Sequence, residues 1–208
     1  MTSNNVFQRY DESDDANFYL QPRLVVHIDD AAIAATTKLL REYLPANGDI
    51  LDLMSSWRSH LPADVAYNRV AGLGMNEIEL RENPQLTDYV VQNLNQHPQL
   101  PYPDASFDGG MVTVSVQYLT NPIAVYREIG RVLRPNAPFL TVFSNRMFPT
   151  KAVAIWQSLD DKGHQQLVRS YYEQTELFSG IEVLDRSPRG WSDPLYAVVG
   201  TKSERAKE

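Results

Sequence analysis

The hydrophobic positions of this chain alternate between short apolar runs and longer stretches of helical periodicity. Residues 49–54 (DILDLM) are predicted as a first strand. Residues 107–116 (FDGGMVTVSV) read as a strand that is apolar on both faces, which is typical of a parallel sheet covered on both sides. Further strands are predicted at 65–73, 87–94 and 137–145. Because these strands alternate with helical stretches, the sequence predicts an α/β fold.

The predicted helices lie between the strands and also precede the first one. Their ranges are 27–45, 75–83, 121–135 and 151–176. Pro122 sits near the start of the third helix and Pro135 ends it. Two apolar runs follow the fourth, at 180–187 and 194–202, with a turn between them. The pattern predicts that they pair as an antiparallel hairpin.

The length of 208 residues suits a single domain, and no linker divides the chain. Residues 1–15 are polar and acidic, and we expect a flexible arm there. Residues 16–45 are expected to form an N-terminal lid and helix, residues 46–201 the core, and residues 202–208 a loose tail.

Composition narrows the function classes. The hydrophobic fraction is 43%, but no apolar run approaches the roughly 18 residues that span a membrane. The N-terminus lacks the apolar region of a secretory signal, so a cytoplasmic location is expected. The net charge of −7, without a Lys/Arg cluster, argues against a nucleic-acid partner. The chain has no cysteine and its four histidines are scattered, so no metal site is expected.

One segment carries a family signature. Residues 100–144 begin LPYPDASFD and continue through a strand and a helix that ends EIGRVLRP. This order resembles the methyltransferase type 11 family of class I S-adenosylmethionine-dependent methyltransferases, and the resemblance extends over about residues 45–145. It implies a Rossmann-like methyltransferase fold with a mostly parallel seven-stranded sheet in the order 3-2-1-4-5-7-6. Helices would cover both faces, and the C-terminal hairpin would complete the sheet.

The resemblance also implies S-adenosyl-L-methionine as cofactor, bound where the first four strands end. In relatives, the first loop is glycine-rich. Here Met54, Ser55 and Ser56 follow Asp52, and all three glycines are missing. Asp52 would keep an acidic role near the cofactor ammonium, while Met54 and the bulky Trp57 would narrow the pocket or displace the loop.

The next loops also depart from the family pattern. Gly74 stands where relatives have the acid that binds the ribose, so Asn76 or Glu77 would have to reach the ribose instead. The side-chain carbonyl of Asn93 would accept a hydrogen bond from the adenine amino group. The residues expected to contact the cofactor are Asp52, Met54, Ser55, Ser56, Gly74, Met75, Asn76, Asn93, Leu94 and Thr113.

Methyl transfer from an activated sulfonium depends on positioning, and a base is needed only if the acceptor must lose a proton. The candidates for a catalytic base are His27, His60 and Tyr118. The partner would be a small-molecule acceptor, and the residues expected on its side are Arg23, Gln117, Tyr118 and Arg146. Each of these residues also has an ordinary structural interpretation.

Three functions remain open on the sequence alone. The first is a methyltransferase acting on an unidentified small molecule. The second is a methyltransferase-fold binding or regulatory protein that has lost cofactor binding, which the missing glycines and the missing ribose acid favour. The third is binding of a different nucleotide-like ligand in the same crevice. Polar residues gather in all three loops, which favours a working pocket.

Overall fold

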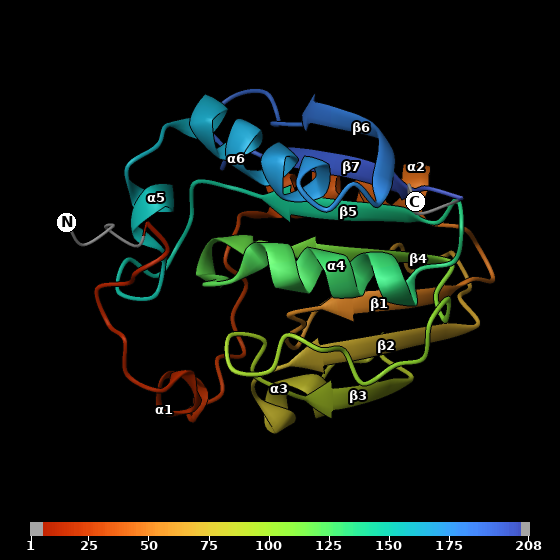
Figure 1. The fold of residues 1–208 in the computed structure, drawn as a ribbon, viewed down its shortest axis with the longest axis horizontal. Coiled ribbons are helices and arrows are strands. Elements are labelled where there is room, and N and C mark those ends of the chain that lie inside the picture. The colour runs from red at the N-terminus through yellow and green to blue at the C-terminus, as the bar shows by residue number, and fades with distance from the viewer. Residues whose placement is uncertain (1–5, 205–208) are drawn as a thin grey trace.

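The computed structural model describes residues 6–204, which form one seven-stranded sheet in the order β3-β2-β1-β4-β5-β7-β6 (Figure 1). β1 to β5 run parallel, whereas β7 pairs antiparallel with both β5 and β6. The predicted fold class is confirmed. The strands are β1 (Asp49–Leu53), β2 (Arg69–Gly74), β3 (Asp88–Val91), β4 (Gly109–Thr113), β5 (Pro138–Phe143), β6 (Phe178–Asp185) and β7 (Tyr196–Lys202).

Helices cover both faces of the sheet. α4 (Pro122–Val132) and α6 (Asp161–Glu173) lie in front of it in Figure 1, and α2 (Asp30–Tyr43) lies behind. Each face of the sheet has its own hydrophobic cluster. One cluster joins the strands to α4 and α6, and the other joins the strands to α2. The central strands are almost wholly buried, which explains why they read as apolar on both faces. The helices α1 (Asp15–Tyr19), α3 (Glu77–Arg81) and α5 (Ala154–Gln157) are short.

Side-chain caps set the helix starts. Asp29 accepts a hydrogen bond from the Ala32 amide at the start of α2, and Asn121 caps α4 in the same way. The single helix expected over 151–176 is wrong, because the chain forms α5 and α6 instead. Asp160 separates them: its side chain accepts from the Gly163 amide and starts a new helix.

The connection between β1 and β2, residues 54–68, contains no helix. A hydrogen-bonded loop and the preceding helix α2 therefore cover the sheet at this point. The consequence is that no helix N-terminus follows β1, although a helix at this place would supply free N–H groups to an anion.

The N-terminal strap, defined here as residues 6–23, is anchored rather than loose. Its backbone pairs with the first turn of α5: the amides of Ala154 and Ile155 donate to the carbonyls of Gln8 and Val6, at 2.7 and 2.8 Å. The arm expected over residues 1–15 is therefore ordered from residue 6 onward. Residues 1–5, and residues 205–208 of the expected tail, lie outside the described range, and Lys202 belongs to β7.

A buried lysine explains this anchoring. The Lys151 side chain is fully buried, and its ammonium donates to the Ser13 carbonyl at 2.9 Å. It also lies 3.1 Å from the Asp11 carboxylate and 3.2 Å from that of Asp15. A buried charge is retained only where it is paired and hydrogen-bonded, so Lys151 fixes the strap in place.

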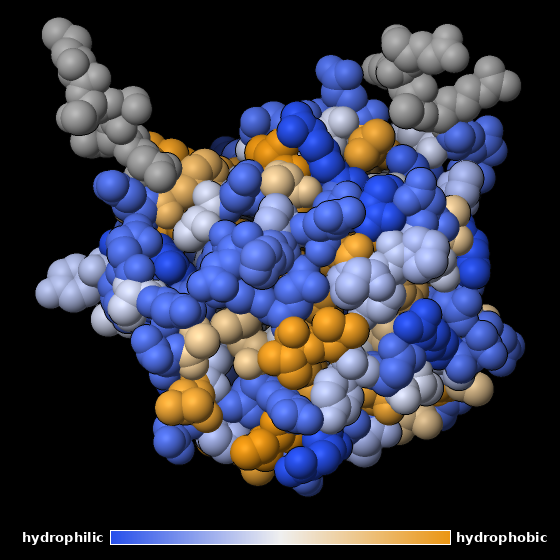
Figure 2. Space-filling view, turned by 60° about the horizontal axis from the view of Figure 1, so that its bottom comes forward, coloured by the Kyte–Doolittle hydropathy of each residue, from blue (hydrophilic) through white to orange (hydrophobic). Residues whose placement is uncertain are grey.

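Hydrophobic residues on the face shown in Figure 2 form separate small patches among hydrophilic ones. In the described part of the chain, no helix has the length and apolar character that crossing a bilayer requires. A cleft lined by polar and apolar side chains lies at the carboxyl ends of the parallel strands.

Candidate functional site

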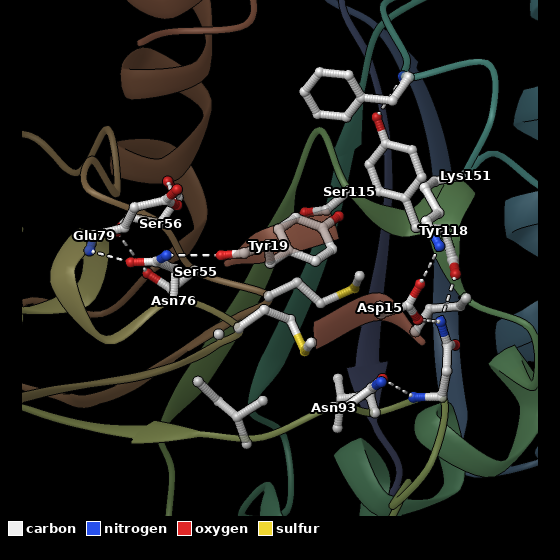
Figure 3. A pocket seen from close by; sticks show the side chains of 18 of the residues that line it. Asp15, Tyr19, Ser55, Ser56, Asn76, Glu79, Asn93, Ser115, Tyr118 and Lys151 are labelled. Carbon is white, nitrogen blue, oxygen red and sulfur yellow. Dashed lines mark hydrogen bonds and ion pairs between the residues drawn. The ribbon is translucent and has the colours of Figure 1, made fainter. Parts of the chain in front are cut away.

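The main cleft lies at the carboxyl ends of β1 to β4, and the N-terminal strap forms its opposite wall (Figure 3). The empty space within it, open mouth included, is about 930 Å³. Figure 3 shows the Tyr19 ring between the group formed by Ser56, Asn76 and Glu79 and that formed by Ser115 and Tyr118. The strap therefore contributes directly to the cleft.

Most of the residues expected to contact the cofactor do line this cleft. They come from the ends of four strands and are brought together by the parallel sheet: Met54, Ser55, Ser56, Gly74, Met75, Asn76, Asn93, Leu94 and Thr113. Asp52 is the exception, because it lies beneath the first loop and lines only a smaller adjacent cavity.

The first loop keeps the backbone shape that a glycine would allow. Met54 has a φ of 55°, in the left-handed region where a non-glycine residue costs about 1 kcal/mol. Its side chain packs against the hydrophobic core beside α4, which offsets this cost. Trp57 does not close the cleft, because its indole N–H donates to the Val25 carbonyl at 2.9 Å and the ring lines the smaller cavity.

The loop then crosses over the end of β2. The Ser55 amide donates to the Leu73 carbonyl at 2.8 Å, and the Ser55 carbonyl oxygen faces Gly74. A Cβ built on Gly74 would lie 2.2 Å from that oxygen. No side chain fits there, so the missing ribose acid is a steric consequence of this loop path.

Glu79 supplies a carboxylate in the same region. It projects from α3 and is largely buried, and it accepts from the Ser56 hydroxyl at 2.7 Å and from the Arg23 amide at 2.6 Å. The sequence pattern pointed to Asn76 or Glu77 at this place, and Glu79 was not predicted. The sequence did contain a signal for Glu79. Asn76 caps α3 and Glu79 follows three residues later, a pattern typical of a helix start in which both side chains lie at the N-terminal end of the helix.

A buried polar network holds the first loop. The Asp52 carboxylate accepts from the hydroxyls of Ser55 and Ser59, both at 2.6 Å. The Asn83 amide donates to the Ser59 hydroxyl at 2.9 Å and to the Ser56 carbonyl at 2.8 Å. Burial raises the pKa of Asp52 to about 6, and the two serine hydrogen bonds oppose the rise. Asp52 therefore braces the loop from below, and the expectation that it reaches into the cofactor cleft is corrected.

The candidate bases are divided between the two cavities. His27 and Tyr118 line the main cleft, whereas His60 lines only the smaller one. Desolvation lowers the pKa of His27, although the nearby Glu79 opposes it, and burial raises the pKa of Tyr118. The Tyr118 hydroxyl accepts from the Phe148 amide at 2.9 Å. A neutral His27 at physiological pH has the free lone pair that a proton acceptor needs.

Two residues expected on the acceptor side do not line the cleft. The Gln117 amide is buried and donates to the carbonyls of Val114 and Arg146, at 3.2 and 3.1 Å. The Arg146 guanidinium pairs with Asp193 at 2.7 Å, outside the cleft. These two predictions are wrong. The Gln117 side chain holds the loop after β5 through the Arg146 carbonyl, and the Arg146 side chain, in that loop, pairs with Asp193. Arg23 and Tyr118 do line the cleft.

Three buried polar atoms of residues in the cleft wall have no hydrogen-bond partner among the described residues. They are Arg9 Nε, which lies 3.5 Å from the Glu12 carboxylate, Arg23 Nη1 and Thr113 Oγ1. A buried group left without a hydrogen bond costs about 1–3 kcal/mol, so such atoms call for an explanation. Arg23 lines the cleft from the strap and Thr113 from the end of β4, so a ligand bound in the cleft is the partner expected for these two atoms.

Residues 61–141 match the methyltransferase domain family. The predicted resemblance is confirmed. Part of this domain is also similar to the biotin biosynthesis bifunctional protein BioHC of Teredinibacter turnerae, with 29% identity over 100 residues. The similar region makes up 42% of this chain and only 17% of that protein.

Several solved structures share the fold of this chain. The [4+2]-cyclase SpnF is 16% identical with a TM-score of 0.59, covering 81% of this chain and 80% of that one. A methyltransferase in complex with the Trm112 activator of Haloferax volcanii is 15% identical with a TM-score of 0.58, covering 85% and 97%. An S-adenosylmethionine-dependent methyltransferase of Mesorhizobium loti is 16% identical with a TM-score of 0.57, covering 81% and 98%. Because a cyclase is among them, the fold by itself does not fix the reaction.

The Gly74 contact predicts a sharp difference between two neighbouring glycines. Gly74→Ala should destabilise the protein by about 3 kcal/mol, because its new Cβ meets backbone. Gly72→Ala should cost about 1 kcal/mol, because the atom it meets is the end of the Leu86 side chain, which can rotate. Urea unfolding midpoints measure both. Equal destabilisation would contradict the proposed loop path.

The buried Asp52 predicts a pH dependence. Its pKa is raised to about 6 in the fold, against about 3.9 in an unfolded chain. The stability it contributes is therefore complete below about pH 4 and is lost as pH rises through about 6. Relative to Asp52→Asn, the native protein should lose about 3 kcal/mol of unfolding free energy across this window. Urea unfolding of both proteins from about pH 4 to about pH 8 tests this, and a constant difference would refute it.

Proposed function

We propose that this chain is an S-adenosylmethionine-dependent methyltransferase acting on a small-molecule acceptor. The observation that carries the proposal is the main cleft itself. It lies at the carboxyl ends of β1 to β4, and Arg23 and Thr113 in its wall each hold a buried polar atom without a hydrogen-bond partner among residues 6–204. The match of residues 61–141 to the methyltransferase domain family supports the same function.

The adenine end of the cofactor fits the loops after β2 and β3. Met75 and Leu94 offer apolar faces on the cleft wall, which suit a flat purine. The Asn93 side-chain oxygen already accepts from the Asn95 amide at 2.9 Å. Its amide nitrogen is therefore the group that is available to a ring nitrogen of the base, in place of the carbonyl contact expected from sequence.

The ribose end fits the group around α3. Glu79 and Ser56 hydrogen-bond to each other at 2.7 Å, and a carboxylate oxygen accepts more than one hydrogen bond. Glu79 thus replaces the acid that cannot stand at position 74. The methionine end fits Thr113, whose hydroxyl lacks a partner, and Ser115, which follows it at the end of β4.

The bound cofactor would supply an activated methyl group on a sulfonium sulfur. The residues of this chain would position the acceptor, exclude water beneath the strap and, for a hydroxyl or amine acceptor, accept its proton on the neutral His27 imidazole. Tyr118 would orient the acceptor; its hydroxyl is already engaged by the Phe148 amide, which suits a positioning role.

One observation favours a second function. The first loop lacks its glycines and is not followed by a helix, so it offers no free helix N–H groups to the cofactor carboxylate. A methyltransferase-fold binding protein that no longer uses this cofactor is the alternative that this feature supports.

Calorimetric titration with S-adenosylmethionine and S-adenosylhomocysteine separates the two functions. We expect both to bind, and we expect Thr113→Val to weaken binding about fivefold, since it removes one hydrogen-bonding hydroxyl without changing shape. Arg169→Gln, on the exposed side of α6, is the matched control and should change nothing. If neither compound binds at millimolar concentration, the methyltransferase proposal fails.

A further inference from the structure

Arg23 is a cation without an anionic partner in the described part of the chain. Its guanidinium lies over the Phe18 ring, 4.3 Å from the ring centroid, and 5.4 Å from that of Phe148. Its backbone amide donates to Glu79, but among residues 6–204 no hydrogen bond engages the guanidinium, and Nη1 is buried. The aromatic rings hold the group in place while leaving its N–H donors unused.

The other two cations in the cleft wall are already neutralised. Arg9 donates to Asp15 at 2.6 Å, and Lys151 lies between Asp15 and Asp11. Arg23 is thus the cleft cation that can accept a ligand anion. The nearby Glu79 carboxylate would repel a bound dianion more strongly than a bound monoanion. The cleft therefore favours an anion with a single negative charge.

An aromatic wall stands beside this guanidinium. Phe148 stacks on Tyr118 with ring centroids 6.0 Å apart and an interplanar angle of 27°. His27 meets the Phe148 ring edge-on at 5.3 Å, and Phe18 meets it at 5.2 Å. Flat aromatic side chains present large apolar surfaces that favour a flat ring in stacked or edge-on contact.

The position of this wall assigns it to the acceptor. Phe148 follows β5, and Phe18 belongs to the strap, whereas the cofactor half of the cleft is built from the loops after β1, β2 and β3 and from Thr113 and Ser115 at the end of β4. Tyr118 and His27, the two candidate bases that line the cleft, lie on this same wall.

We infer that the acceptor is a small aromatic molecule carrying one carboxylate, with its ring on the Tyr118–Phe148 wall and its carboxylate on Arg23. This inference rests on the proposed function and specifies its substrate class. A charge-assisted hydrogen bond from a guanidinium to a carboxylate is among the stronger polar contacts, so the carboxylate should dominate recognition.

The test uses 4-hydroxybenzoate as probe, with 4-hydroxybenzamide, acetate and phenyl phosphate for comparison. Calorimetry measures each with the full chain, in the presence and in the absence of S-adenosylhomocysteine. We expect 4-hydroxybenzoate to bind, and the other three to bind about tenfold more weakly or not at all, since each lacks the single carboxylate or the ring.

Variants locate the contact. Arg23→Gln should weaken 4-hydroxybenzoate about tenfold and abolish its preference over the amide, while leaving S-adenosylhomocysteine affinity unchanged. Arg23→Lys keeps the charge and should retain part of the affinity. Arg169→Gln is again the control, and a thermal melt of each variant establishes folding.

The outcomes separate this inference from the function on which it rests. Equal binding of acid and amide, stronger binding of phenyl phosphate, or no binding of 4-hydroxybenzoate at millimolar concentration overturns the aromatic carboxylate. A loss of S-adenosylhomocysteine affinity in Arg23→Gln, with 4-hydroxybenzoate unaffected, overturns it too and assigns Arg23 to the cofactor. Failure of S-adenosylhomocysteine to bind the unaltered protein, with Arg23-dependent binding of 4-hydroxybenzoate intact, sinks the methyltransferase proposal alone.

Discussion

The carbonyl oxygen of Ser55 occupies the space in which a side chain at position 74 would begin. This contact forces glycine at the end of β2 and so removes the acid that relatives place there. It also brings Ser56 to within 2.7 Å of Glu79, which returns a carboxylate to the cleft from α3. One close backbone approach therefore accounts for both the loss of an acid and its replacement by another.

A network beneath the loop makes this approach stable. Asp52 holds two serine hydroxyls, and Asn83 ties the loop to the segment after α3. Such a network is costly unless every member is satisfied, because an unpaired buried polar group is penalised in a low-dielectric interior. The network supports the first loop in place of a helix after β1. The side of the loop that faces the cleft therefore consists of backbone and small side chains.

The opposite wall depends on another buried charge. Lys151 is fully buried beneath the strap and pairs with Asp11 and Asp15. The strap that it holds carries Tyr19 and Arg23 into the cleft. The two walls are thus fixed by separate polar clusters, and the unpartnered donors between them are the part of the structure that a ligand would complete.

The fold could be predicted because its signals are local. Apolar strands, capped helices and the LPYPDASFD to RVLRP segment each determine structure within a few residues of themselves. The site could be predicted only in part. The loops expected from the strand ends do line one cleft, but the partner of each side chain depends on contacts between distant segments.

Three residues illustrate this limit. Lys151 begins a predicted helix, and nothing near it in sequence predicts its burial under the strap, which brings it to Asp15, 136 positions away (151 − 15). Glu79 enters the cleft only because the loop over Gly74 draws Ser56 toward it. Met54 takes a glycine conformation that its own propensity disfavours, since core packing outweighs about 1 kcal/mol of strain.

A crystal structure of the protein with S-adenosylhomocysteine tests the central claim most directly. The account predicts the ligand in the main cleft, with its adenine between Met75 and Leu94 and its ribose hydroxyls on Glu79. Thr113 Oγ1 should gain a hydrogen bond from or to the ligand. A ligand bound elsewhere, or one whose ribose makes no contact with Glu79, would contradict the account.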